Sequence, residues 1–381
     1  MISYKKKIMI IAGEASGDLH GAHLVRAMLG LNPGLEFFGI GGNALRQAGV
    51  RIRIDNSEMA VVGISEAFSK INLLLRALKL AKQDLRESRP DLLILIDFPD
   101  FNLRVAHVAQ RLGIPVMYYI SPQVWAWRTG RVKKIKGVVD HMVVIFPFEV
   151  DFYKKWNVPV TFVGHPLLDT MQPEATEGKA EDLKGNGLLV GLLPGSRNEE
   201  VTRLLPTMVQ VAEILSERVE GIRFAIPVAS SVDRAGVEAE VRGTNTRFLI
   251  LSNRLHDVLR VARLVITASG TVTLEAAITG TPMIIVYKVS ALSYWLGKCL
   301  IRVKHIGLAN LVAGRQIVPE LIQADASAET IADQALRMLR DEKGLAQMRH
   351  ELLQVGERLG MPGASRRAAE VAMSLLSGNC V

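Results

Sequence analysis

Short, continuous aliphatic runs separated by amphipathic segments constrain the fold of this chain more than any other feature. In the first half the runs are IMIIAG, LEFFGIGG, DLLILIDFP, IPVMYYIS and HMVVIFPF. Runs of this length are typical of strands buried on both faces, and the helical patterns between them indicate successive β-α-β units. The first half is therefore predicted to form a parallel, doubly wound sheet.

The same pattern restarts after a polar stretch, MQPEATEGKAEDLKGN, and continues with GLLVGLLPG, IRFAIPVA, TRFLILS, RLVITASG and PMIIVYKV. A chain of 381 residues that is 49% hydrophobic can support two cores. We expect an α/β protein with a first Rossmann-like domain at 1–170, a linker at 171–186, a second such domain at 187–345, and C-terminal helices at 346–381. Ligands in this architecture bind at the carboxyl ends of the strands, so the two domains are expected to face each other across a cleft.

The composition limits which classes of binding partner and which cellular compartment are expected for this protein. The formal net charge of +8 indicates an anionic partner, either nucleic acid, an acidic membrane surface or a phosphorylated substrate. The basic residues form no stripe interleaved with aromatic residues, so nucleic acid is not expected. Two cysteines without a C-x-x-C pair fit a reducing cytosol, and membrane association is expected to be peripheral because no apolar run approaches about 20 residues. The sequence lacks D-x-D, H-E-x-x-H and P-loop motifs, so no metal and no cofactor are predicted.

The loop GEASGD follows the first strand and leads into a helical segment. Backbone N–H groups at such a helix start favour phosphate or sugar oxygens, which makes Ser16, Gly17 and Asp18 candidate substrate-binding residues. A tight turn in which Ser16 or Asp18 caps the helix explains the loop equally well.

Two turns of the second half have the same form. In LLPGSR, Arg197 is expected to project a permanent charge suited to a diphosphate leaving group. In ASGTVTLE, the small residues Ser269, Gly270 and Thr271 let backbone approach phosphates closely, and Glu275 could accept hydrogen bonds from ribose hydroxyls. The alternative for Glu275 is that it only complements the helix N-terminus.

Asp97 ends a very apolar strand in the motif DFPDFN. A partly desolvated carboxylate at this place can act as a general base, so Asp97 is the predicted catalytic residue, whereas Asp100 is expected to cap the next helix. Further along, SPQVWAWR places Arg128 beside two tryptophans, which would suit an acceptor sugar phosphate. A pair of core tryptophans is the alternative.

A helix is predicted over residues 64–82, with basic residues flanking an unusually wide apolar face. This pattern suits either packing against a sheet or shallow insertion into an anionic bilayer. The candidate membrane or acyl-chain residues on it are Ile64, Phe68, Ile71, Leu74, Leu75 and Leu78.

Seven motifs in order between residue 10 and about residue 325 resemble those of the lipid A disaccharide synthases: GEASGD, DFPDFN, SPQVWAWR, FVGHPLLD, LLPGSR, ASGTVTLE and NLVAGRQIVPELIQ. The resemblance implies a GT-B type inverting glycosyltransferase that joins UDP-2,3-diacylglucosamine to 2,3-diacylglucosamine 1-phosphate, giving the β-1,6-linked disaccharide and UDP. It also implies that Asp97 deprotonates the acceptor 6-hydroxyl. The donor-binding positions it implies are Arg197, Ser269, Gly270, Thr271, Glu275, Asn310 and Gln316.

The resemblance further implies a peripheral enzyme on the cytoplasmic face of the inner membrane, in contact with anionic phospholipids through the helix at 64–82. Family members tend to return the final helix to the first domain and can exchange C-terminal regions in a dimer. The resemblance therefore allows a homodimer, and the sequence does not decide the oligomeric state. Two other functions remain: a UDP-sugar 2-epimerase or GT-B transferase with a soluble acceptor, and a nucleotide-binding protein without turnover.

Overall fold

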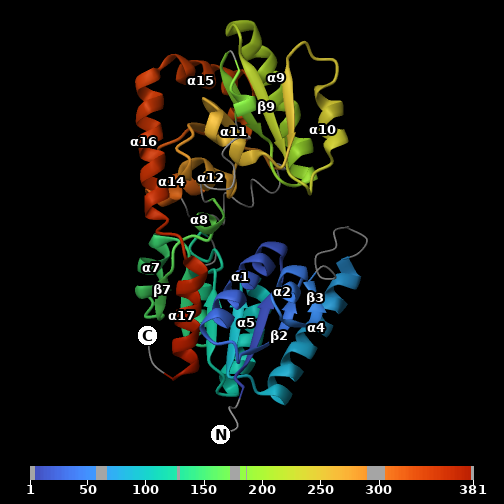
Figure 1. Ribbon diagram of the computed structural model, residues 1–381, viewed down its shortest axis with the longest axis vertical. Helices are drawn as coiled ribbons and strands as arrows, with labels where there is room; N and C mark the ends of the chain where they lie inside the picture. Colours follow the sequence, from blue (N-terminus) through green and yellow to red (C-terminus); the bar gives the residue numbers. More distant parts are fainter. Residues whose placement is uncertain are drawn as a thin grey trace. The chain divides into compact units, whose positions relative to one another are not determined.

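A computed structural model describes residues 5–56, 67–126, 129–171, 181–185, 187–289 and 305–378. The chain divides into two compact units (Figure 1). Unit 1 comprises Met1–Asp169 and Gly360–Val381, and unit 2 comprises Thr170–Leu359. The last helix of the chain therefore belongs to the unit that contains the first strand.

Unit 1 is built on a parallel sheet in the order β3-β2-β1-β4-β5-β6-β7. Its strands are β1 (Lys7–Ala12), β2 (Glu36–Gly41), β3 (Arg51–Asp55), β4 (Leu92–Ile96), β5 (Val116–Tyr119), β6 (His141–Val144) and β7 (Val160–Phe162). Every residue of β4 is buried, as is every residue of β1 after Lys7. Helices cover both faces of this sheet, which explains why its central strands are aliphatic throughout instead of alternating.

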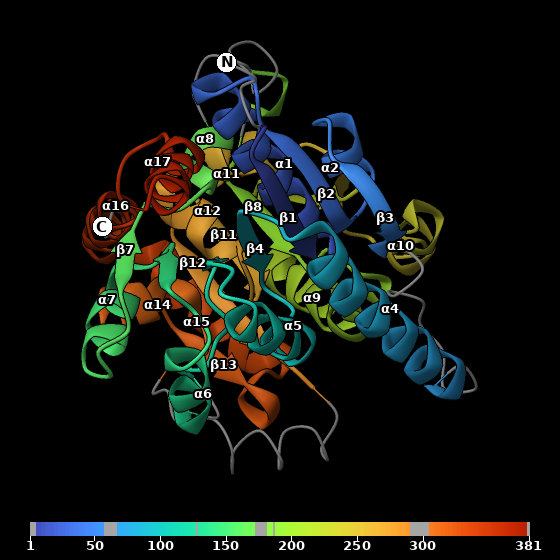
Figure 2. The same ribbon diagram turned by 90° about the horizontal axis from the view of Figure 1, so that it is seen from below.

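The helices of unit 1 are α1 (Ala15–Leu31), α2 (Asn43–Gln47), α4 (Ala67–Ser88), α5 (Pro99–Arg111), α6 (Val132–Lys136), α7 (Pro147–Lys154), α8 (Leu167–Thr170, at the boundary with unit 2) and α17 (Ala364–Leu376). Helix α17 packs beside α1, and Figures 1 and 2 show the two side by side. The backbone N–H of Gly363 donates to Asp169, and Arg367 Nε donates to the carbonyl of Val163 at 2.8 Å. These bonds tie the returning C-terminal segment to the residues that follow β7.

Unit 2 contains a second parallel sheet, in the order β10-β9-β8-β11-β12-β13. Its strands are β8 (Leu189–Leu193), β9 (Arg223–Val228), β10 (Phe248–Ser252), β11 (Leu264–Ala268), β12 (Met283–Tyr287) and β13 (Glu320–Ile322). The helices are α9 (Asn198–Arg218), α10 (Arg234–Val241), α11 (Leu255–Val261), α12 (Val272–Ile278), α14 (Leu308–Ala313), α15 (Ala328–Arg340) and α16 (Glu342–Arg358). The prediction of two parallel α/β domains is confirmed.

The residues of helix α4 that were predicted to contact a membrane differ in burial. Leu78 is buried in the core of unit 1 and Leu74 packs against that core, because their side of the helix faces the sheet. Leu75 lies on the other side and is 53% exposed. Ile64 and the side chains of Phe68 and Ile71 lie outside what the structure describes.

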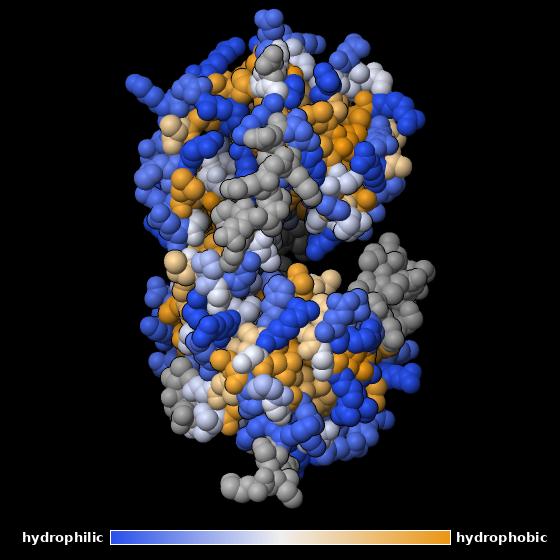
Figure 3. Space-filling model, in the orientation of Figure 1, coloured by the Kyte–Doolittle hydropathy of each residue, from blue (hydrophilic) through white to orange (hydrophobic). Residues whose placement is uncertain are grey.

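Apolar side chains also gather in patches on the surface view of each unit, bordered by hydrophilic ones (Figure 3). Among the described helices, none combines the length and the apolar character needed to cross a bilayer.

Each sheet has one point where the chain order reverses direction. In unit 1 it lies between β1 and β4, which pair directly through Ala12 and Ile96. In unit 2 it lies between β8 and β11. The loops that leave two such strands diverge to opposite faces of the sheet, and the space between them is where ligands bind in doubly wound folds.

Candidate functional site

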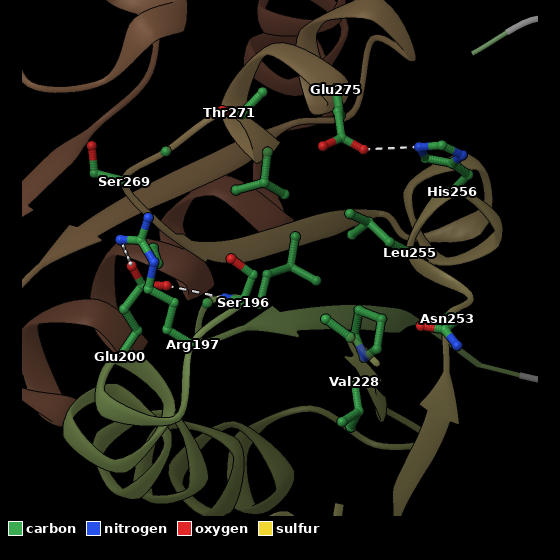
Figure 4. Close-up of a pocket in the computed structure, with 17 residues that line it drawn as sticks. Ser196, Arg197, Glu200, Val228, Asn253, Leu255, His256, Ser269, Thr271 and Glu275 are labelled. Atoms are coloured by element: carbon green, nitrogen blue, oxygen red, sulfur yellow. Dashed lines mark hydrogen bonds and ion pairs between the residues drawn. The ribbon is translucent and has the colours of Figure 1, made fainter. Parts of the chain in front are cut away.

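A cavity of about 500 Å³ opens at the carboxyl end of the sheet in unit 2 (Figure 4). The turns that follow β8 and β11 form its walls, so it lies at the reversal point of the strand order. About half of its lining residues are polar or charged and the others are apolar or glycine, so it can bind a ligand that carries both polar and apolar groups. The predicted residues that line it are Arg197, Ser269, Gly270, Thr271 and Glu275.

The turn after β8 is held by a carboxylate from α9. Glu200 Oε2 accepts a hydrogen bond from the backbone N–H of Ser196 at 3.0 Å, and Glu200 Oε1 lies 3.4 Å from Arg197 Nη1. Gly195 has φ +133°, and a Cβ there would lie 2.4 Å from Glu200 Oε2. The turn therefore requires glycine, while the Arg197 side chain is 77% exposed and free to meet an anion.

We expect Gly195→Ala to lower the free energy of unfolding of the protein by roughly 1–3 kcal/mol, because alanine is strained in this backbone region and its methyl group would displace Glu200. Gly270→Ala is the matched control, since a Cβ at Gly270 meets no atom within 4 Å. Thermal unfolding of the two variants tests this difference. Equal melting temperatures would show that the turn tolerates a side chain.

The turn after β11 brings Ser269 to Thr271 to the mouth of the same cavity. Ser269 Oγ donates to the carbonyl of Ile306 at 3.2 Å, and Glu275 projects from the first turn of α12. Glu275 Oε2 lies 2.8 Å from Nε2 of His256 on α11 (Figure 4). This hydrogen bond raises the pKa of His256 above 6.5, opposed by partial burial. Among the described residues no hydrogen bond reaches the second oxygen of Glu275, which can therefore accept one from a ligand hydroxyl.

The other two predicted donor residues lie elsewhere in unit 2. Asn310 is fully buried, and its amide donates to Val318 O at 2.9 Å and Glu320 Oε1 at 2.7 Å while accepting from the N–H groups of Ile317 and Val318. Its bonding capacity is thus used within the protein. Gln316 is exposed, and neither residue lines the cavity. Their binding roles remain predictions.

In unit 1, Asp97 follows β4 directly and adopts an unusual backbone. Asp97 has φ +45° and Phe98 has φ +47°, both in the left-handed region, which costs L-residues roughly 1–2 kcal/mol each. Strain of this kind persists only where neighbouring contacts enforce it and is frequent at functional sites. The Phe98 ring lies against Gly13, where a Cβ would come within 2.4 Å of the ring.

The surroundings of Asp97 suit a base. Burial raises the pKa of its carboxyl above the ordinary 3.8, repulsion from Glu14 raises it further, and a hydrogen bond from the Phe98 N–H opposes both. Glu14 belongs to the loop after β1, and Asp97 to the loop after β4, so the pair spans the reversal point of this sheet. A carboxylate that holds its proton more tightly than usual accepts one more readily from a hydroxyl.

The three candidate residues of the GEASGD loop differ in exposure: one is open to solvent and two are buried. Ser16 is exposed in the first turn of α1, and Gly17 is buried where an added Cβ would lie 3.4 Å from Ile96 Cγ2. Asp18 is buried, and its carboxylate accepts from the N–H groups of Gly42, Ala44 and Leu45 at 2.6–3.3 Å. Asp18 therefore caps α2, whereas the sequence suggested that it could cap α1, the helix on which it lies. Substrate contact by these residues remains a prediction.

Asp100 does not cap a helix as expected. Helix α5 begins at Pro99, earlier than the sequence suggested, so Asp100 lies inside its first turn and pairs with Arg131. Trp125 Nε1 donates to the buried Glu149 at 3.1 Å, and its ring contacts Phe148. Arg128 and Trp127 lie outside the described residues.

Three residues of these two sites were not predicted from the sequence. His256 and Asn253 line the cavity of unit 2, and Glu14 acts on Asp97. Asn253 has φ +55°, a conformation that asparagine tolerates better than most residues and that its position after a predicted strand could have suggested. The partnership of His256 with Glu275 joins two helices and has no local signal.

Solved structures with a similar fold include two kinds of enzyme. The UDP-GlcNAc 2-epimerase of Neisseria meningitidis, solved bound to UDP-GlcNAc, superposes with a TM-score of 0.63 at 11% identity, covering 97% of this chain and 100% of that one. The calicheamicin glycosyltransferase CalG4 gives a TM-score of 0.63 at 14% identity, covering 98% of both chains. These likenesses establish the GT-B type of fold predicted from the motifs, and nothing about the reaction.

Sequence comparison identifies the family. The model of the Lipid-A-disaccharide synthetase family, LpxB, matches residues 8–374. The lipid-A-disaccharide synthase of Geobacter sulfurreducens is 51% identical over 375 residues, 97% of each chain. Those of Nitrosococcus oceani and Coxiella burnetii are 44% and 39% identical, covering 97% of this chain and 96% and 99% of theirs. The chain, with its two switch-point sites, therefore belongs to the lipid-A-disaccharide synthase family of glycosyltransferases.

Proposed function

We propose that this protein transfers 2,3-diacylglucosamine from UDP to the 6-hydroxyl of 2,3-diacylglucosamine 1-phosphate, forming the β-1,6-linked lipid A disaccharide 1-phosphate and UDP. Asp97 takes the proton of the acceptor hydroxyl as its oxygen attacks the anomeric carbon from the face opposite UDP. The bond to UDP breaks in the same step, so the configuration inverts. The nearly full-length match to the family is the observation that carries this proposal.

The cavity of unit 2 is the proposed UDP site. Its backbone turn at Ser269–Thr271 offers N–H groups to the diphosphate, and Arg197, on the turn after β8, adds a permanent positive charge where negative charge develops on departing UDP. Glu275 accepts hydrogen bonds from the ribose hydroxyls with the oxygen that His256 leaves available. Asn310 and Gln316 are proposed to complete the donor site, Asn310 through the backbone it organises.

A turnover assay tests the reaction directly. Purified protein with UDP-diacylglucosamine should release UDP only when the monosaccharide 1-phosphate acceptor is added, and mass spectrometry should find the disaccharide 1-phosphate. UDP release without acceptor would contradict the proposal. Interconversion of UDP-sugar epimers would favour the epimerase alternative, and UDP-sugar binding without turnover on either route would favour a binding protein.

We further propose that α4 contacts anionic phospholipids on the cytoplasmic face of the inner membrane. Leu75 and Leu80 are exposed on this helix, at 53% and 37%, and the basic residues Arg76 and Lys79 are exposed beside them. Flotation with vesicles containing anionic lipid tests the contact, with neutral vesicles as the control. Full activity on deacylated substrates without vesicle binding would favour a soluble acceptor. Mass measurement in solution decides whether the protein is a monomer or a homodimer.

The affinity for UDP should depend on pH through His256. Its hydrogen bond to Glu275 raises the pKa of the imidazole, so the positive charge of His256 in the UDP cavity is fully present below the ordinary value of 6.5 and is lost as pH rises through the raised pKa. We expect UDP to bind roughly 2- to 5-fold more tightly below that range than above it. Calorimetry from pH 6 to 9 measures the effect, which His256→Gln should abolish.

A further inference from the structure

The main-chain carbonyl of Asp97 accepts hydrogen bonds from two buried side chains. Tyr118 donates its hydroxyl at 2.5 Å, and Asn102 donates Nδ2 at 2.6 Å. Both donors are fully buried. Asn102 Nδ2 also donates to the carbonyl of Ile96 at 3.2 Å, so one amide group serves the last residue of β4 and the residue that follows it.

The two donors reach Asp97 from separate elements. Tyr118 lies on β5, where it is in register with Leu95, so its side chain extends past the end of β4. Asn102 lies in the first turns of α5, where its backbone N–H also donates to Phe98 O at 3.0 Å. A strand and a helix thus fix the same peptide group from two directions.

This peptide group joins the two left-handed residues, Asp97 and Phe98. A relaxed backbone would turn the carbonyl away from both donors and leave two buried polar side chains without this acceptor. Left-handed geometry at Asp97 also decides the direction of its side chain, because the orientation of the Cα–Cβ bond follows from φ and ψ. The hydrogen bonds to the carbonyl and the aim of the carboxylate are therefore linked.

We propose that Tyr118 and Asn102 are positioning residues for the transfer reaction: they clamp the carbonyl of Asp97, hold the strained backbone, and so aim the Asp97 carboxylate at the acceptor hydroxyl. This inference rests on the proposed function. It assigns neither residue a contact with substrate. A misplacement of about 1 Å in a reacting group can reduce turnover on the order of 100-fold, so a clamp at this point controls the rate.

Tyr118→Phe is the sharpest test, because it removes one hydroxyl and keeps the buried ring. Tyr119→Phe is the matched control: Tyr119 follows on the same strand, is equally buried, and points to the opposite face of the sheet. We expect Tyr118→Phe to lower kcat on the order of 10- to 100-fold with KM for both substrates within about 2-fold. Tyr119→Phe should retain kcat within about 2-fold. Asn102→Ala should act in the same direction as Tyr118→Phe.

A second readout does not require turnover. Titration of the Asp97 carboxyl by NMR, with the signal assigned by its absence in Asp97→Asn, should show its pKa falling towards the ordinary 3.8 in Tyr118→Phe as the freed side chain gains access to solvent. In Tyr119→Phe the pKa should stay raised. If the wild-type protein transfers no sugar, the proposed function fails while this titration still tests the clamp. Equal kcat values for the two tyrosine variants, or an unchanged pKa in Tyr118→Phe, would overturn the inference.

Discussion

Asp97→Asn should lower kcat for disaccharide formation by on the order of 1,000-fold while leaving KM for the donor nearly unchanged. The amide keeps the size and the hydrogen-bonding shape of the side chain but cannot accept the proton of the acceptor hydroxyl. Donor binding is assigned to unit 2, so it should not respond. Steady-state kinetics with both lipid substrates varied gives the two parameters separately.

The same substitution should not destabilise the protein. Burial and Glu14 raise the pKa of Asp97 in the folded state, so its ionised form opposes folding at neutral pH, and stability falls as pH rises from the unfolded value near 3.8 through the folded pKa. A neutral amide removes that cost. The melting temperature of Asp97→Asn at pH 7 should equal or exceed that of the wild type. In the wild-type pH–rate profile, the apparent pKa on the acidic side should lie above 3.8.

Asp100→Asn is the control for this prediction. Asp100 lies three residues along the same motif, but its side chain is 73% exposed and pairs with Arg131. Its replacement should change kcat by less than about 5-fold, as expected for a surface ion pair. Comparable losses of kcat in the two variants would exclude Asp97 as the specific base.

Arg197→Ala should have the second largest effect, a fall in kcat on the order of 100- to 1,000-fold. The guanidinium is exposed in the cavity and lies 3.4 Å from Glu200, a loose pairing that can give way to a diphosphate. Its charge is worth most as UDP departs, so kcat should fall more than UDP affinity. Arg197→Lys should recover part of the rate, since lysine keeps the charge and loses the planar pair of donors.

Arg218→Ala controls for the loss of one positive charge. Arg218 lies in the last turn of the same helix, α9, and pairs with Asp333 on the surface. Its replacement should leave kcat and UDP affinity within about 2-fold of the wild type. Single-turnover kinetics and calorimetry separate the chemical step from binding. An Arg197→Ala variant that loses affinity and retains kcat at saturation would mean that this residue binds UDP without assisting its departure.

The sequence predicted the parts of the fold that depend on local pattern. The aliphatic runs mark the central strands because both faces of each sheet are covered, and glycine-rich turns mark the places where strands lead into helices. From these it follows that Arg197 and Ser269–Thr271, more than 70 positions apart, gather at one sheet edge. The reversal of strand order brings them together.

Contacts between distant side chains were beyond the same reasoning. Nothing local to Asp18 indicates that it caps α2, 25 residues further along the chain. Nor does the pattern of α4 show which half of its wide apolar face meets the core, where Leu78 is buried and Leu75 is exposed. The left-handed backbone at Asp97 depends on Tyr118, which lies on the neighbouring strand. Each outcome is decided by packing after the elements have formed.

The return of α17 to unit 1 has a consequence for biosynthesis. Unit 2 is a contiguous stretch, Thr170–Leu359, inserted between two parts of unit 1. During translation the whole of unit 2 is synthesised before α17. The sheet of unit 2 can therefore fold while the surface of α1 that α17 will cover is still exposed to solvent. The unit that holds Asp97 therefore becomes complete only when α17 has been synthesised, after the whole of unit 2.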